Sequence, residues 1–123
     1  MVVRIILIQA QLSCKMQAFR DMYELNFDKM DTLFDKIINK DIPANVVYED
    51  NKVLAFRDID PQAPSHVIII PKVKDNLIGL SKAEERHCEI LGSLLYTAKL
   101  VAKQEGLEDG FRVVINDGPA GFC

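Results

Sequence analysis

The stretch from Ala55 to Lys72, AFRDIDPQAPSHVIIIPK, constrains the fold of this 123-residue chain more than any other. It joins two apolar runs with the composition of strands, VLAF and VIII, through a connection that contains Pro61 and Pro64. Because proline fixes φ and has no amide hydrogen to donate, this connection can form neither a helix nor a central strand. The sequence therefore predicts two strands joined by a rigid turn, with Asp58 and His66 at its two ends.

A short helix is predicted before this stretch. Asp31 or Thr32 can cap its N-terminus. Its apolar positions recur at i, i+1, i+4 and i+5 and form one face, which consists of Leu33, Phe34, Ile37 and Ile38. We expect Ile42-Pro43 to end the helix, because the residue before a proline is pushed toward extended conformations. From periodicity alone, this apolar face is equally well explained as part of the core.

The segments around the central stretch predict an antiparallel sheet. Residues 46–48 have the composition of a strand, residues 49–52 that of a turn, and residues 53–56 that of the antiparallel partner. The run from His66 to Ile70 is apolar throughout, as expected for a strand with both faces covered. A last strand, Phe111 to Asn116, has the alternation of a half-buried strand.

The longest predicted helix extends from Ser81 to about Glu105. Ser81 and Glu84 have the spacing of a capping box, and Gly106 supplies the stop. The helix has a wide apolar stripe, made of Ile90, Leu91, Leu94, Leu95, Ala98, Val101 and Ala102. This stripe is wider than one sheet face needs to cover, although a plain core helix is the simpler interpretation. The predicted fold class is α+β, an antiparallel sheet with two helices.

Composition and charge limit the classes of partner. Hydrophobic residues make up 49% and charged residues 27% of the chain, which is ordinary for one soluble globular domain. The net charge of -3 and the pI near 5.3 give no basic field for nucleic acid or for a membrane surface, so neither is an expected partner. A small mononucleotide remains compatible.

The first thirty residues, 1–30, are interpreted as an N-terminal extension of a domain at 31–123. Their apolar opening is too short to span a bilayer, and acidic residues count against the alternative of a mitochondrial presequence. Cys14, Cys88 and Cys123 are widely spaced and form no C-x-x-C pair. We therefore expect no disulfide framework and no metal site, and a reducing compartment fits this cysteine usage.

Three blocks of sequence resemble the histidine triad superfamily, in particular its Hint branch of protein kinase C inhibitor homologues. They are residues 32–38 followed by Ile42-Pro43, the stretch from Ala55 to Lys72, and residues 110–116 with Gly118. The resemblance covers about residues 31 to 121. It implies a purine nucleotide ligand of AMP type, no cofactor, and a cytoplasmic or also nuclear location. The implied activity is the hydrolysis of nucleoside 5′-phosphoramidates through a nucleotidyl-histidine.

The resemblance also implies the nucleotide-binding residues. The residues implied for the base are Leu33, Phe34, Ile37, Phe56 and Ile59. Asp58 is implied as the ribose ligand, Arg57 as a rim residue and Asn116 as the phosphate ligand, with His66 as a supporting histidine. Without the resemblance, Asp58 is simply a turn-capping aspartate and His66 a structural hydrogen-bonding group. Arg57 is expected to be a solvated rim residue, and His87 is expected to be solvated near the start of the long helix.

The family's H-x-H-x-H motif is missing, because the chain ends at Phe122-Cys123 and its only histidines are His66 and His87. No residue is assigned a catalytic role, the C-terminal strand is expected to be missing, and the chain as written is predicted to be inactive, with an unpaired strand edge. A homodimer is expected through the Ser81–Glu105 helix and the Phe111–Asn116 strand. The alternatives are a non-enzymatic dimerisation or regulatory variant, or a truncated gene model of an active hydrolase.

Overall fold

The structure is a computed structural model that describes residues 3–6, 35–57 and 66–118. Its centre is a five-stranded sheet with the order β2-β3-β4-β1-β5, in which neighbouring strands are antiparallel. The strands are β1 (Val3–Ile6), β2 (Val46–Glu49), β3 (Val53–Arg57), β4 (His66–Pro71) and β5 (Arg112–Ile115). One long helix, α3 (Cys88–Gln104), and a short helical segment at 35–38 accompany the sheet. The predicted α+β fold with an antiparallel sheet is confirmed.

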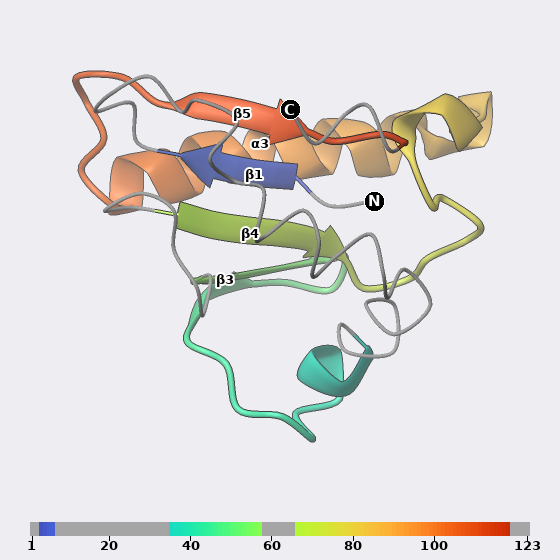
Figure 1. The fold of residues 1–123 in the computed structure, drawn as a ribbon, viewed down its shortest axis with the longest axis horizontal. Coiled ribbons are helices and arrows are strands. Elements are labelled where there is room, and N and C mark those ends of the chain that lie inside the picture. Colours follow the sequence, from blue (N-terminus) through green and yellow to red (C-terminus); the bar gives the residue numbers. More distant parts are fainter. Residues whose placement is uncertain (1–2, 7–34, 58–65, 119–123) are drawn as a thin grey trace.

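Strand β1 lies between β4 and β5 (Figure 1). Its Val3 is opposite both Ile69 of β4 and Ile115 of β5, and its Ile6 is opposite both His66 and Arg112. Both outer strands are antiparallel to β1, so β4 and β5 run in the same direction. The sheet therefore includes residues 3–6, which the sequence analysis placed in the N-terminal extension. One side of β5 is paired with β1 of the same chain.

The β2–β3 hairpin is present as predicted. Its turn is closed by Asp50, whose Oδ1 accepts the backbone N–H of Lys52 at 2.7 Å and that of Val53 at 2.8 Å. Burial alone would raise the pKa of the Asp50 carboxyl, but the two N–H donors, the Tyr48 hydroxyl and the charge of Lys72 together outweigh burial and lower the pKa. The side chain of Asp50 thus supplies the acceptor that this turn needs.

The two sides of the sheet are covered by different elements, and α3 lies behind the sheet in the view of Figure 1. We call the side that α3 covers the α3 face and the opposite side the far face. The α3 face carries the larger core, in which Val53, Ala55, Val67 and Ile69 meet Leu94, Ala98, Val101, Ala102 and Leu107. The far face carries a smaller cluster of Leu54, Phe56, Ile68 and Ile70 with Ile37. Strand β4 is buried on both sides, as its apolar run predicted.

The start of α3 differs from the prediction. Leu80–Lys82 and Glu85–His87 form short 3₁₀ helices, and α3 begins only at Cys88. Ala83 and Glu84 have extended backbones, which separates Ser81 from α3, and the capping box is formed by Glu84 with His87 instead. The predicted Ser81 cap was therefore wrong.

Both helical segments end on a left-handed residue. Gly106, with φ of 72°, follows α3, and the N–H of Leu107 returns to the Ala102 carbonyl at 2.9 Å, so the predicted glycine stop is confirmed. Lys40, with φ of 65°, plays the same part after the 35–38 segment, where the N–H of Asp41 returns to the Lys36 carbonyl at 2.8 Å. This segment therefore ends before Ile42-Pro43. Within the described residues, no helix has the length and apolar character needed to cross a membrane.

Candidate functional site

Four of the predicted nucleotide-binding residues belong to the far face. Ile37 and Phe56 pack in the same buried cluster, with exposed fractions of 9% and 3%. His66 is also buried and shares this face with Ile68 and Ile70, because side chains alternate along β4. Ile115 packs against the core of the α3 face, so the alternation of β5 predicts that Asn116, the residue after the strand, is turned to the far face. Residues from three distant parts of the sequence thus belong to one side of the sheet.

The register shows that this surface is long. His66 is level with Arg112 across β1, whereas Ile69 is level with Ile115. Asn116 is therefore level with Ile70, at the other end of β4 from His66. At about 3.3 Å per residue, four steps separate the two ends by roughly 13 Å. A ligand that contacts both ends has to be extended along the strands.

The other predicted nucleotide-binding residues, apart from Arg57, are Leu33, Phe34, Asp58 and Ile59; they lie outside the described residues, and their roles stay predictions. Asp58 directly follows Arg57 at the end of β3.

Arg57 does not belong with the far-face residues. Its Nη2 donates to both carboxylate oxygens of Glu105, each at 2.7 Å, and this places the guanidinium on the α3 face. The strand pattern gave the signal, because Val53 and Ala55 face α3 and Arg57 continues their alternation. The Arg57 side chain is 42% exposed, but the expectation of a merely solvated rim residue was wrong because it is paired with a carboxylate.

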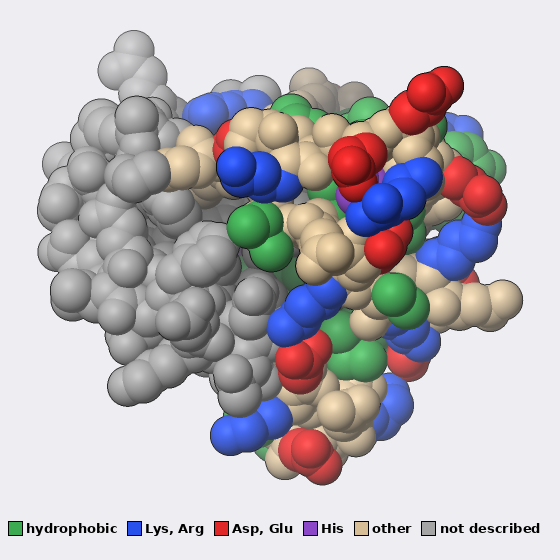
Figure 2. Space-filling model, turned by 90° about the vertical axis from the view of Figure 1, so that its right-hand side faces the viewer, with side chains coloured by type: hydrophobic (Ala, Val, Ile, Leu, Met, Phe, Trp, Pro, Cys, Tyr) green, Lys and Arg blue, Asp and Glu red, His purple; other side chains and the backbone are tan. Residues whose placement is uncertain are grey.

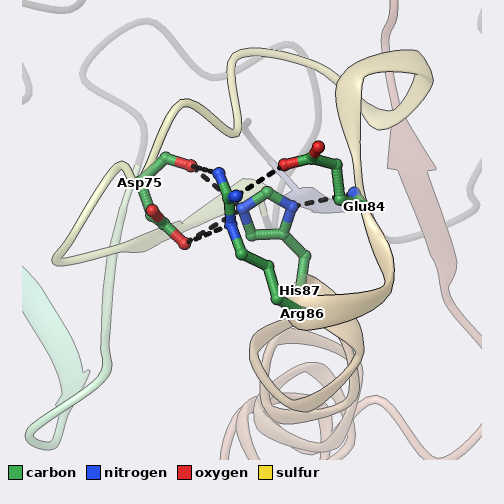
Figure 3. Close-up of polar contacts among 4 residues, drawn as sticks. All are labelled: Asp75, Glu84, Arg86 and His87. Carbon is green, nitrogen blue, oxygen red and sulfur yellow. Dashed lines mark hydrogen bonds and ion pairs between the residues drawn. The ribbon is translucent and has the colours of Figure 1, made fainter.

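His87 is buried, with 1% exposure, although it was expected to be solvated. Its Nδ1 accepts the Glu84 backbone N–H at 2.9 Å, so Nε2 carries the proton and donates to the Asp75 carbonyl at 2.9 Å (Figure 3). Arg86 adds contacts to the carboxylates of Asp75 at 3.2 Å and Glu84 at 2.8 Å. Asp75 and Asn76 both have positive φ, at 45° and 61°. His87 therefore holds a strained turn to the start of α3, and the E-x-x-H spacing was the available signal.

A close contact that the sequence analysis missed fixes the turn after β5. Asp117 Oδ2 accepts the backbone N–H of Ser81 at 3.2 Å. A Cβ on Gly79 would lie 2.2 Å from Asp117 Oδ1, so only glycine leaves room for this carboxylate. The contact ties the residue directly after Asn116 to the Gly79–Ser81 segment.

Ion pairs hold the 35–41 segment near the sheet. Lys74 Nζ is 2.9 Å from Asp35 Oδ2, and Glu49 contacts both Lys72 at 2.7 Å and Lys40 at 3.1 Å. The hydrogen bonds from Lys72 and Lys40 lower the pKa of the Glu49 carboxyl. Over the face shown in Figure 2, basic and acidic side chains are interspersed, and the described residues form no extended area of one sign.

The described residues offer no fit for a metal ion. No group of three His, Cys, Asp or Glu side chains among them could ligate one. Both ring nitrogens of His87 are already used by the fold, and the neighbouring Cys88 is exposed.

The family model of the HIT domain matches residues 39–122 of this chain. The 14 kDa zinc-binding protein of Zea mays is 77% identical over 94 residues, which cover 76% of this chain and 73% of that protein. Adenylylsulfatase HINT1 of Arabidopsis thaliana is 74% identical over 90 residues, which cover 73% of this chain and 61% of that protein.

Solved structures of HIT family proteins are also similar to this chain. The HIT family hydrolase from Legionella pneumophila Philadelphia 1 superposes with a TM-score of 0.66 and 44% identity, over 72% of this chain and 79% of that one. A histidine triad protein from Clostridium difficile superposes with a TM-score of 0.67 and 38% identity, over 75% of this chain and 79% of that one.

Proposed function

Since this chain belongs to the HIT domain family, in its Hint branch, we propose that the far face of the sheet binds a purine nucleoside monophosphate. The observation that carries the proposal is that Ile37, Phe56 and His66 lie on one side of the sheet, with Ile37 and Phe56 in one buried cluster, and Asn116 follows the end of β5. The surface extends along the whole of β4, with Phe56 opposite Ile68 at its middle, which gives room for a ligand larger than a single base.

Each residue type suits its proposed role. Ile37 and Phe56, with Leu33, Phe34 and Ile59, supply apolar contact for the base. A carboxylate such as Asp58 can accept hydrogen bonds from both vicinal hydroxyls of a ribose, and the Asn116 amide can donate to a phosphate oxygen. We leave Arg57 out of this set because its guanidinium is bound to Glu105 on the α3 face.

The family is one of hydrolases, and the name of the Arabidopsis relative supports an adenylyl group as the bound part of the ligand. Family chemistry on nucleoside 5′-phosphoramidates uses a histidine nucleophile. These 123 residues contain only His66 and His87, and both ring nitrogens of His87 are engaged in the fold. For the polypeptide of these 123 residues we therefore propose nucleotide binding without turnover. The zinc in the relatives' names enters no step, because the described residues do not fit a metal ion.

Calorimetric titration of the 123-residue chain with AMP and CMP tests the proposal. We expect AMP to bind, CMP to bind about tenfold more weakly or not at all, and Phe56→Ala to lose AMP binding while the protein stays folded by circular dichroism. Leu107→Ala is the matched control, since it removes buried apolar surface from the α3 face and should leave the AMP affinity unchanged. A folded chain that binds neither nucleotide, or both equally, would contradict the proposal, and release of product from adenosine 5′-phosphoramidate would contradict the lack of turnover.

We also propose a homodimer through α3 and β5. Leu95 and Tyr96 of α3 are 52% and 59% exposed, and a side chain on Gly92 would meet nothing within 4 Å. The β2 edge of the sheet is obstructed by a register shift after Val46 and by Gln104, whose Nε2 donates to the Val47 carbonyl at 2.8 Å. The β5 edge is the better one for pairing with a second copy.

Sedimentation equilibrium tests the dimer. Tyr96→Glu should shift the chain to a monomer, whereas Val73→Glu, which changes a 73% exposed residue on another surface, should not. A wild-type chain that is monomeric at all accessible concentrations rules the dimer out. Association of this chain only with a longer copy that carries the histidine triad would favour the regulatory alternative.

A further inference from the structure

Glu105 occupies a position that is unfavourable for an acidic side chain. It is the C-cap of α3, where the partial charge of the helix end is negative, and a carboxylate is disfavoured there. Its side chain is also only 11% exposed, so it has lost much of its hydration. The compensating group is the Arg57 guanidinium, whose Nη2 lies 2.7 Å from each Glu105 oxygen. The ion pair with Arg57 therefore offsets the two unfavourable effects on Glu105.

The pair is part of a set of contacts that fasten the β2–β3 hairpin along α3. At the C-terminal end of the helix, Gln104 donates to the Val47 carbonyl beside the Arg57–Glu105 pair. At the N-terminal end, Lys52 of the hairpin turn pairs with Glu89. The helix therefore contacts the hairpin at both ends, and only the C-terminal contacts lie near the end of β3.

Arg57 is the last residue of β3 and has defined backbone partners. Its N–H donates to the Asn45 carbonyl at 2.9 Å, and Arg57 is opposite Val67 of β4. Because side chains alternate, holding the Arg57 side chain on the α3 face holds Phe56 toward the far face. The residue after Arg57 is Asp58, the proposed ribose ligand.

We propose that Arg57 and Glu105 are positioning residues, whose ion pair fixes the end of β3 on α3 and so presents Phe56 to the nucleotide, while neither Arg57 nor Glu105 contacts the nucleotide. This inference rests on the proposed function. It replaces a direct role of Arg57 in ligand binding, and it makes the partly buried Glu105, which the sequence analysis did not single out, a determinant of affinity.

A charge-swapped pair separates positioning from contact. We would measure AMP affinity by calorimetry for the full chain and for Glu105→Gln, Arg57→Met and the double variant Arg57→Glu with Glu105→Arg. Each single variant should bind AMP about tenfold more weakly, which corresponds to about 1.4 kcal/mol. The swapped pair should recover most of the affinity, because the ion pair is restored and the helix end then carries a cation.

The Glu89→Gln variant is the matched control, since it breaks the hairpin contact at the other end of α3 and should leave the affinity unchanged. Hydrogen exchange of the Arg57 amide gives a readout that needs no ligand. Glu105→Gln should speed that exchange, and the swap should slow it again, whereas Glu89→Gln should not change it.

Three results would overturn the inference. The first is a Glu105→Gln variant that binds AMP like the wild type, with only the Arg57 variants weakened and no recovery in the swap, because Arg57 would then contact the ligand. The second is an equal loss in Glu89→Gln, which would mean a general loss of stability. The third is an unchanged hydrogen exchange rate of the Arg57 amide in Glu105→Gln, which would refute the positioning role even without a ligand. A wild-type chain that does not bind AMP would refute the proposed function, separately from this exchange result.

Discussion

The two faces of the sheet are covered to different extents. The α3 face is covered by a 17-residue helix, and its core is continuous and apolar. The far face is covered among the described residues by a much shorter helical segment, which packs Ile37 into a smaller apolar cluster and is flanked by exposed ion pairs such as Lys74–Asp35 and Lys40–Glu49. Exposed ion pairs contribute little to stability compared with buried apolar surface.

This difference suggests that the two faces serve two tasks, which are stability on the α3 face and ligand binding on the far face. Most of the free energy of folding should come from the α3 face, whereas the far face can use its residues for a ligand. Arg57 and Glu105 connect the tasks, because their pair lies on the α3 face and acts on the strand end that serves the far face. Substitutions on the α3 face should therefore affect mainly the free energy of unfolding, whereas those on the far face should also affect nucleotide affinity.

The largest expected effect is on the α3 face. Leu94 is fully buried between α3 and the sheet, and Leu94→Ala should lower the free energy of unfolding by about 2–5 kcal/mol. Chemical denaturation measures this loss, with Val73→Ala as a surface control that should change it by less than about 0.5 kcal/mol. A cost below about 1 kcal/mol would remove the distinction between the faces.

A matched pair of smaller substitutions sharpens the comparison. Ile37→Val on the far face and Ile69→Val on the α3 face each remove one methylene, and each should cost about 0.5–1.5 kcal/mol of stability. Only Ile37→Val should also weaken AMP binding, because only Ile37 is on the proposed ligand surface. Equal effects of the two variants on AMP affinity, measured by the same titration, would show that the faces do not divide their tasks.

The smallest effect is expected in the hairpin turn, which belongs to neither face. The pKa of Asp50 is lowered in the folded protein, so its stabilising contribution is present above the unfolded pKa, near 3.9, and is lost as the pH falls through the lower folded value. Asp50→Ala should reduce the free energy of unfolding by less than about 1 kcal/mol near neutral pH, because the turn is partly exposed. The difference from wild type should shrink in acid, and a difference that grows in acid would refute this account.

Much of the sheet could be predicted, because alternation and apolar runs are local signals. The hairpin, β4 and β5 followed from them, and so did the stop at Gly106. The place of β1 could not be predicted, since an apolar run does not say which strands it pairs with. The wrong start of α3 has a similar reason, because the extended backbones of Ala83 and Glu84 override the capping spacing of Ser81.

The candidate site was less predictable than the fold. The resemblance named Ile37, Phe56, His66 and Asn116, but their common face appeared only once the strands were paired. Arg57 was misjudged because its partner Glu105 is 48 positions further along the chain. His87 was misjudged because its charged neighbours suggest exposure, whereas its E-x-x-H spacing from Glu84 was the local signal of its capping role.

The position of β1 has a consequence for the order in which this protein folds. Val3 pairs with Ile69 and Ile115, so the middle strand of β4, β1 and β5 comes earlier in the sequence than both of its neighbours. During synthesis β1 has to wait without partners until β4 and then β5 leave the ribosome. Such distant pairings fold slowly, and during the delay an apolar segment is available to chaperones or to other nascent chains.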